Sequence, residues 1–119
     1  MMRIIILSLL FLNLCSCAVF KPLPPGSPVR PTHITSEINQ GKRYFNEGYY
    51  KRAMHNLLPL ACDGYPEAQY AVGYMYYYGL GVAQDTFVGY FWIKRSADQQ
   101  FYPAIQAQQL IDTGKNARA

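Results

Sequence analysis

An internal repeat in the second half of the chain constrains the fold more than any other feature. A shift of 36 positions places small residues on small residues and large apolar residues on large apolar residues. The aligned pairs are Ala53 and Gly89, Leu57 and Ile93, Ala61 and Ala97, Tyr65 and Phe101, Ala68 and Ala104, and Ala71 and Ala107. A two-helix period of this length is typical of an α-solenoid, in which each hairpin buries its apolar face only against its neighbours. We therefore expect an all-α fold, a short α-solenoid of antiparallel helix hairpins.

Glycine and proline mark the expected ends of the helices. Gly64 ends the second helical pattern and Pro66 opens the third. Pro103 opens the fifth pattern and Gly114 ends it, as is usual for these two residue types. Within a helical-repeat domain of residues 35–114, the pattern predicts a hairpin at 36–63, a second hairpin at 66–99 and a capping helix at 103–113.

Finer expectations follow from the residues of each helix. Ser36 is expected to cap the first helix, and Pro59 to kink or weaken the second. The fourth helix is expected to bury the face that carries Gly89, Trp92, Ile93, Ser96 and Ala97. The fifth is expected to turn Ala104, Ala107, Leu110 and Ile111 inward, with a polar outer face that suits the end of a solenoid.

Residues 68–104, "AQYAVGYMYYYGLGVAQD…GYFWIKRSADQ…A", resemble the Sel-one-like repeat. The matching positions, which the resemblance makes structural, are Gly73, Tyr76, Gly79, Gly81, Val82, Asp85, Trp92 and Ala97. The sequence departs from the family pattern at Val72, Gly89, Ser96 and Gln100, and Gly89 is expected to weaken its helix by about 1 kcal/mol relative to alanine. The upstream hairpin is nearer to the related tetratricopeptide pattern, through Gly41, Tyr44 and Ala53.

The resemblance implies a non-catalytic adaptor that binds a protein or peptide through a concave face lined by the first helix of each hairpin. Tyr70, Tyr74 and Tyr77 share one face of the third helix, and tyrosine suits such recognition. They are our candidate partner-binding residues. The alternative is that these rings pack against the neighbouring hairpin, through Tyr44 and Phe45.

The loop "LGVAQD" at residues 80–85 is expected to connect two helices rather than to bind a ligand. Gly79 and Gly81 permit backbone angles closed to other residues, and Asp85 can cap the following helix. A phosphate site would need glycines leading directly into a helix and a nearby basic residue.

The amino terminus resembles a bacterial lipoprotein. Residues 1–16 read as a signal peptide, and "LCSC" resembles a lipobox that ends at Cys17. The resemblance implies acylation of Cys17, and Ala18 at the next position favours the outer membrane, with the domain facing the periplasm. An ordinary cleaved signal and a secreted product are the alternative. Residues 17–34 carry this cysteine and a proline-rich tether, and residues 115–119 form a tail.

Little in the sequence points to catalysis, cofactors or nucleic acid. His55 and Cys62 lie seven positions apart on one helix, about 10 Å, which is too far for a direct hydrogen bond, and no metal-ligand set is apparent. Loss of Cys15 with the signal and alkylation of Cys17 predict that Cys62 forms no disulfide within the chain. The net charge of +4 is spread over pairs of basic residues, which is more typical of solvated helix faces than of a nucleic-acid surface.

Three functions are weighed on this basis. The leading one is a lipid-anchored adaptor that binds another protein or peptide of the bacterial envelope. The second is a structural assembly factor of an envelope secretion or pilus machine, and the third is a small periplasmic enzyme. Because stable arrays usually need about three repeats, a homodimer or docking onto a larger assembly is a further expectation.

Overall fold

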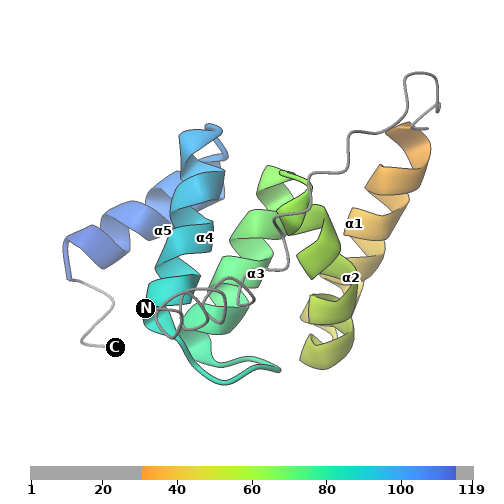
Figure 1. Cartoon of the computed structure of the whole chain (residues 1–119), viewed down its shortest axis with the longest axis horizontal. Coiled ribbons are helices and arrows are strands. Elements are labelled where there is room, and N and C mark those ends of the chain that lie inside the picture. The colour runs from red at the N-terminus through yellow and green to blue at the C-terminus, as the bar shows by residue number, and fades with distance from the viewer. Residues whose placement is uncertain (1–30, 115–119) are drawn as a thin grey trace, which may run out of the picture.

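The computed structural model describes residues 31–114. The predicted signal peptide, Cys17, nearly all of the predicted tether and residues 115–119 lie outside the described residues. Within the described range the regular elements are helices: α1 (Pro31–Asn46), α2 (Tyr50–Cys62), α3 (Pro66–Tyr78), α4 (Thr86–Asp98) and α5 (Tyr102–Asp112) (Figure 1). The predicted all-α class is confirmed.

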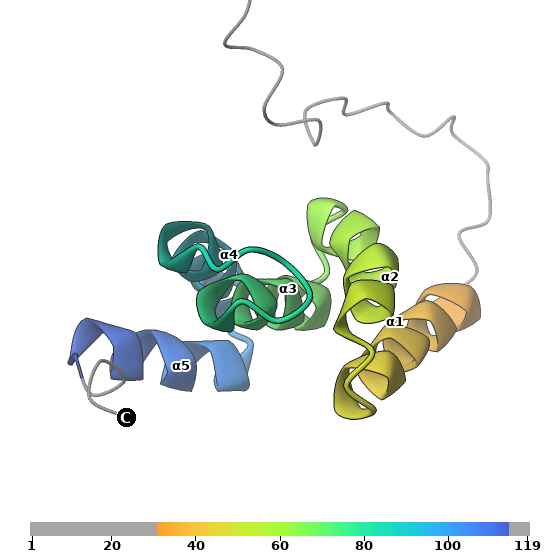
Figure 2. The same cartoon turned by 90° about the horizontal axis from the view of Figure 1, so that it is seen from below.

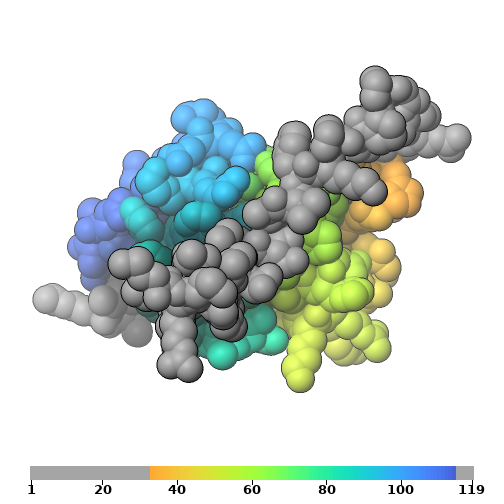
Figure 3. Space-filling model, viewed as in Figure 1, coloured from red at the N-terminus to blue at the C-terminus, as the bar shows by residue number. Residues whose placement is uncertain are grey.

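The helices are stacked in chain order. Each helix packs against the one before it and the one after it, and α1 also touches α3. The space-filling view shows this order as bands of colour across the molecule (Figure 3). Seen from below, α2 and α4 lie on one side of the stack, and α1 and α5 lie on the other (Figure 2). This arrangement of successive hairpins confirms the predicted short α-solenoid.

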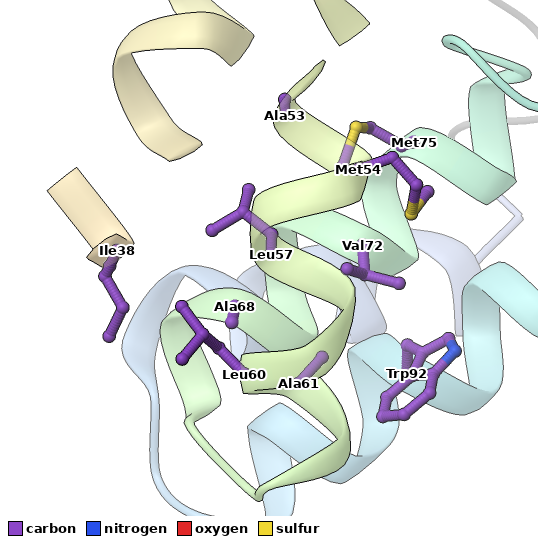
Figure 4. Packing of buried hydrophobic residues seen from close by; sticks show 10 residues of the cluster. All are labelled: Ile38, Ala53, Met54, Leu57, Leu60, Ala61, Ala68, Val72, Met75 and Trp92. Carbon is purple, nitrogen blue, oxygen red and sulfur yellow. The ribbon is translucent and has the colours of Figure 1, made fainter. Parts of the chain in front are cut away.

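The main core joins the two hairpins. Leu57 of α2 and Val72 of α3 are both 0% exposed. Met54 lies beside Met75 at one end of the cluster, while Trp92 approaches from α4 (Figure 4). Burial of such side chains contributes about 1.5–3 kcal/mol each. The hairpins therefore share one apolar core, as the repeat predicts.

The first helix begins earlier than expected. α1 starts at Pro31, so Ser36 lies inside the helix and does not cap it, and the last four residues of the predicted tether are helical. Proline is favoured at the first position of a helix, where its fixed φ is suitable and its missing N–H costs nothing. His33 Nδ1 lies 3.2 Å from Glu37 Oε1 one turn later. The sequence analysis placed the start of this helix too late because it assigned every proline up to residue 34 to the tether.

Two further expectations concern α2 and α5. α2 continues through Pro59 to Cys62, so this proline does not end the helix. On α5 only Ala104 is fully buried, and Ala107 and Ile111 are half-buried against Ile93 and Ala97. Leu110 was expected to face inward and is 44% exposed. It lies six residues after the buried Ala104, which turns it about 120° away from that face of the helix.

Candidate partner-binding surface

A row of aromatic rings crosses the stack from the end of α1 to the start of α5. Phe45 contacts Tyr50 and Tyr74, with ring centroids 5.5 and 5.7 Å apart. Tyr74 in turn lies 6.2 Å from Tyr70, and Tyr70 lies 5.8 Å from Phe101. Tyr78 adjoins this row, because its ring centroid is 4.6 Å from that of Tyr74. We call these residues the aromatic strip: Tyr50, Phe45, Tyr74, Tyr70, Phe101 and Tyr78.

Helical spacing on α3 builds the centre of the strip. Tyr70, Tyr74 and Tyr78 are four residues apart and therefore form one line along the helix. Phe45 reaches Tyr74 from the last turn of α1, and Phe101 reaches Tyr70 from the residue before α5. The strip thus joins the end of α1, the start of α2, one face of α3 and the residue before α5.

The rings of the strip are only partly covered by the rest of the protein. Five of the six are half-buried, and Tyr78 is 45% exposed. Burial, together with the neighbouring Tyr74 and Tyr78, raises the pKa of the Tyr70 hydroxyl. Burial and the neighbouring Tyr74 and Tyr77 likewise raise the pKa of Tyr78. Tyr70 and Tyr78 therefore present uncharged rings and hydroxyl groups on this surface.

The structure brings together two of the three predicted site residues. Tyr70 and Tyr74 lie in the strip, and Tyr74 packs against Phe45 of the first hairpin, as the alternative interpretation expected. Tyr77 lies to one side, where its ring contacts Tyr78 at 5.1 Å and its backbone is close to Gly89. The prediction missed Tyr78, although its four-residue spacing from Tyr74 was a usable signal. Phe101 could not be found from local pattern, because it reaches the strip only through the stacking of α5.

The loop at residues 79–85 is held as a connector. Gly79 and Gly81 have φ of 69° and 71°, in the left-handed region. Gly81 also lies so close to the start of α2 that a Cβ there would be 2.7 Å from the Cβ of Tyr50. Asp85 accepts hydrogen bonds from the backbone N–H groups of Phe87 and Val88, at 3.1 and 3.0 Å. The predicted cap at Asp85 is confirmed.

The two helices joined by this loop cross at a pair of glycines. A Cβ on Gly73 would lie 2.8 Å from the carbonyl oxygen of Gly89, and a Cβ on Gly89 would lie 2.8 Å from the carbonyl oxygen of Gly73. Gly89 would also meet the backbone nitrogen of Tyr77 at 2.6 Å. Gly89 was expected only to weaken its helix, but it is what permits this close crossing.

The other predicted repeat residues have packing roles. The face of α4 predicted to be buried is buried in full, and Trp92 and Ala97 are 8% and 5% exposed. Tyr76 is half-buried against the main core. The prediction missed Gln69, which is 1% exposed and donates to the carbonyl of Ala61 at 3.1 Å. Its own side-chain oxygen accepts from Gln99 at 2.7 Å, so this buried amide joins α2, α3 and the end of α4.

The residues weighed for catalysis do not form a reactive group. His55 is exposed on α2, beside a pocket whose lining otherwise consists of Glu37, Gln40, Asn56, Pro59 and Leu60. Cys62 is disulfide-bonded, contrary to the expectation from the sequence. The expectation applies to a processed chain, whereas this structure is that of the full sequence, which still carries Cys15 and Cys17. Among residues 31–114, no three His, Cys, Asp or Glu side chains are grouped as metal ligands would be.

Three further properties of the described residues concern membrane-spanning length, buried polar atoms and exposed rings. None of the helices within residues 31–114 combines the length and the hydropathy that crossing a bilayer would require. Every buried side-chain nitrogen or oxygen in the same range has a hydrogen-bond partner. The most exposed aromatic rings outside the strip are Phe87 and Tyr102, at 83% and 66%.

Comparison with known proteins identifies the second hairpin. The family model of the Sel1 repeat matches residues 66–101, which span α3, the connecting loop, α4 and the residue before α5. Searches of curated proteins and of solved structures returned no match to this chain. Proteins with this repeat generally mediate protein–protein interaction. The chain thus contains a Sel1 repeat, formed by residues 66–101 and stacked between the first hairpin and α5.

Proposed function

We propose that this protein is a non-catalytic adaptor, anchored by lipid in the bacterial cell envelope, that captures a protein or peptide on the aromatic strip. The observation that carries the proposal is the strip itself: a row of contacting rings left partly open to solvent across three helices. Buried rings of an ordinary core would be covered on all sides. Tyrosine-rich surfaces supply large and rather rigid contact area, and such residues dominate the energetics of many interfaces.

The absence of catalysis is inferred from the chemistry of the available side chains. Acid–base or nucleophilic catalysis needs two groups within hydrogen-bond reach of each other. Cys62 and His55 lie seven positions apart on α2, about 10 Å along the helix, which is beyond direct hydrogen-bond reach. His55 has no salt-bridge partner among the described residues. These observations favour a binding role over an enzymatic one.

Crosslinking in intact envelopes tests the adaptor function. The protein is tagged after Ala119, crosslinked in the living envelope and purified with its bound partner. We expect Tyr78→Ser to reduce partner capture about tenfold or more, because loss of one central contact residue costs roughly 2 kcal/mol. Tyr102→Ser, at an exposed tyrosine outside the strip, should capture the partner normally. Equal capture by both variants would contradict the proposal.

The lipid anchor is proposed from the sequence, since Cys17 lies outside the described residues. The "LCSC" motif resembles a lipobox, and several acyl chains are needed for stable attachment to a membrane. We expect labelled palmitate to be incorporated into the wild-type protein and not into Cys17→Ser. Labelling that survives this substitution would overturn the anchor. Fractionation of the envelope should place the labelled protein in the outer membrane, facing the periplasm.

A homodimer and an assembly role are tested by related measurements. If a second copy completes the core, the melting temperature should rise with protein concentration. A melting temperature independent of concentration would reject the homodimer. A structural role in a secretion or pilus machine would use the same strip with a different client, and the crosslinked partner distinguishes it from a general adaptor.

A further inference from the structure

The prolines that precede α1 have a regular spacing. Four of them recur at every third position: Pro22, Pro25, Pro28 and Pro31. A polyproline II helix has three residues per turn, so residues at this spacing share one edge. Pro31 is the first residue of α1, which places the other three directly before the stack.

We propose that the chain's own segment of residues 21–30 docks on the aromatic strip as a polyproline II helix. Grooves lined by aromatic rings are a recurring receptor for such helices, because the preformed ligand loses little entropy on binding. This inference rests on the proposed function, since it names the first occupant of the same surface.

The polar chemistry of the two partners also fits. The strip contains no charged side chain, and four of its six members carry a hydroxyl: Tyr50, Tyr70, Tyr74 and Tyr78. A proline-rich segment offers many carbonyl acceptors and few N–H donors. Tyrosine hydroxyls can donate to those carbonyls while the ring faces cover the prolines. The raised pKa of Tyr70 keeps its hydroxyl proton in place.

The segment is long enough to reach the strip within one molecule. Phe45 lies 14 residues after the first residue of α1, which corresponds to about 21 Å along the helix. Ten residues of polyproline II span about 31 Å. The segment can therefore turn back beside α1 and cover the rings of Phe45, Tyr74 and Tyr78, which are in consecutive contact.

Docking of this kind would make the strip self-covered until a partner displaces the segment. An intramolecular ligand competes at a high effective concentration, in the millimolar range for short connections. A client must then bind more tightly than the segment, or carry several proline-like contacts of its own. The adaptor would be selective for such clients and would show less exposed aromatic surface when unoccupied.

Methyl NMR of the mature protein in detergent tests the inference. Leu23 and Val29 are the methyl-bearing residues of the segment, and contact with tyrosine rings would shift their signals upfield. We expect these shifts in the wild type and their loss in Tyr78→Ser, with Tyr102→Ser as the matched control. Contacts seen only at high protein concentration, or signals at unstructured positions in the wild type, would overturn intramolecular docking.

A second pair of variants changes the segment and leaves the helices intact. The double substitution Pro25→Ala and Pro28→Ala removes two rings from the period-three edge, whereas Pro24→Ala removes one ring outside it. We expect the double variant to lose the methyl shifts and to capture more partner, and Pro24→Ala to resemble the wild type. Equal shifts in both would overturn the inference. If the shifts are absent but Tyr78→Ser still loses partner capture, only this inference fails; if the shifts are present but capture is unaffected, only the proposed function fails.

Discussion

At the scale of single residues, a departure from the repeat pattern has a structural consequence that the sequence alone did not reveal. Gln100 occupies a position where the Sel-one-like pattern has glycine, and its φ is 64°. It is the only non-glycine residue with positive φ among the described residues. The turn between α4 and α5 imposes this angle, and a side chain there costs about 1–2 kcal/mol. The family glycine is thus explained by backbone geometry.

The first prediction is that Gln100→Gly stabilises the protein. Glycine adopts the left-handed conformation without steric cost, although it also makes the unfolded chain more flexible. The net gain should be about 1 kcal/mol in the free energy of unfolding, measured by urea denaturation. Gln100→Ala is the control, because alanine keeps the Cβ and should give no such gain. An equal gain from both substitutions would contradict this explanation.

The second prediction concerns alkaline pH. Because the pKa of Tyr70 is raised above its ordinary value of 10.0 in the folded state, this hydroxyl ionises first in the unfolded chain. Its contribution to stability is complete below pH 10 and is lost as the pH rises through the folded-state pKa. The urea midpoint of the wild type should therefore fall more steeply above pH 10 than that of Tyr70→Phe. Parallel profiles for the two proteins would contradict the assignment.

At the scale of helices, side-chain size at the crossing of α3 and α4 outweighs helix propensity. Helix propensity alone predicts that Gly89 destabilises α4. However, the backbone at this position approaches α3 too closely for any larger residue. Local composition also failed to predict where α1 begins. The tether composition suggested an extended segment up to residue 34, but helix α1 already begins at Pro31.

The third prediction is that Gly89→Ala destabilises the protein despite the better helix propensity of alanine. The added Cβ would meet backbone atoms of Tyr77 and Gly73, which cannot move aside as a flexible side chain could. Overpacking of this kind typically costs about 1–3 kcal/mol, more than the roughly 1 kcal/mol gained from propensity. A lower melting temperature is expected. Gln109→Ala, at an exposed position of α5, should change it little, and a rise in Gly89→Ala would show that the helices can separate freely.

At the scale of the whole molecule, the sequence predicted the architecture better than the surface. The repeat period and the glycine and proline positions were sufficient for five helices, and the second hairpin begins at Pro66 as predicted. Tyr70 and Tyr74 were identified because they follow helical spacing. Phe45 and Phe101 enter the strip only because α1 and α5 stack on either side of α3, a relation that local spacing does not contain.

The most direct test of the account is equilibrium unfolding followed by two signals at once, since the strip exists only if the hairpins form one stack. Trp92 is the single tryptophan and packs in the core shared with α2, so its fluorescence reports on contact between the hairpins. Far-ultraviolet circular dichroism reports on all helices. We predict coincident transitions with one midpoint in urea. Fluorescence that changes at lower urea than the helical signal would show that the hairpins separate before they unfold, and would contradict a shared core and a continuous aromatic strip.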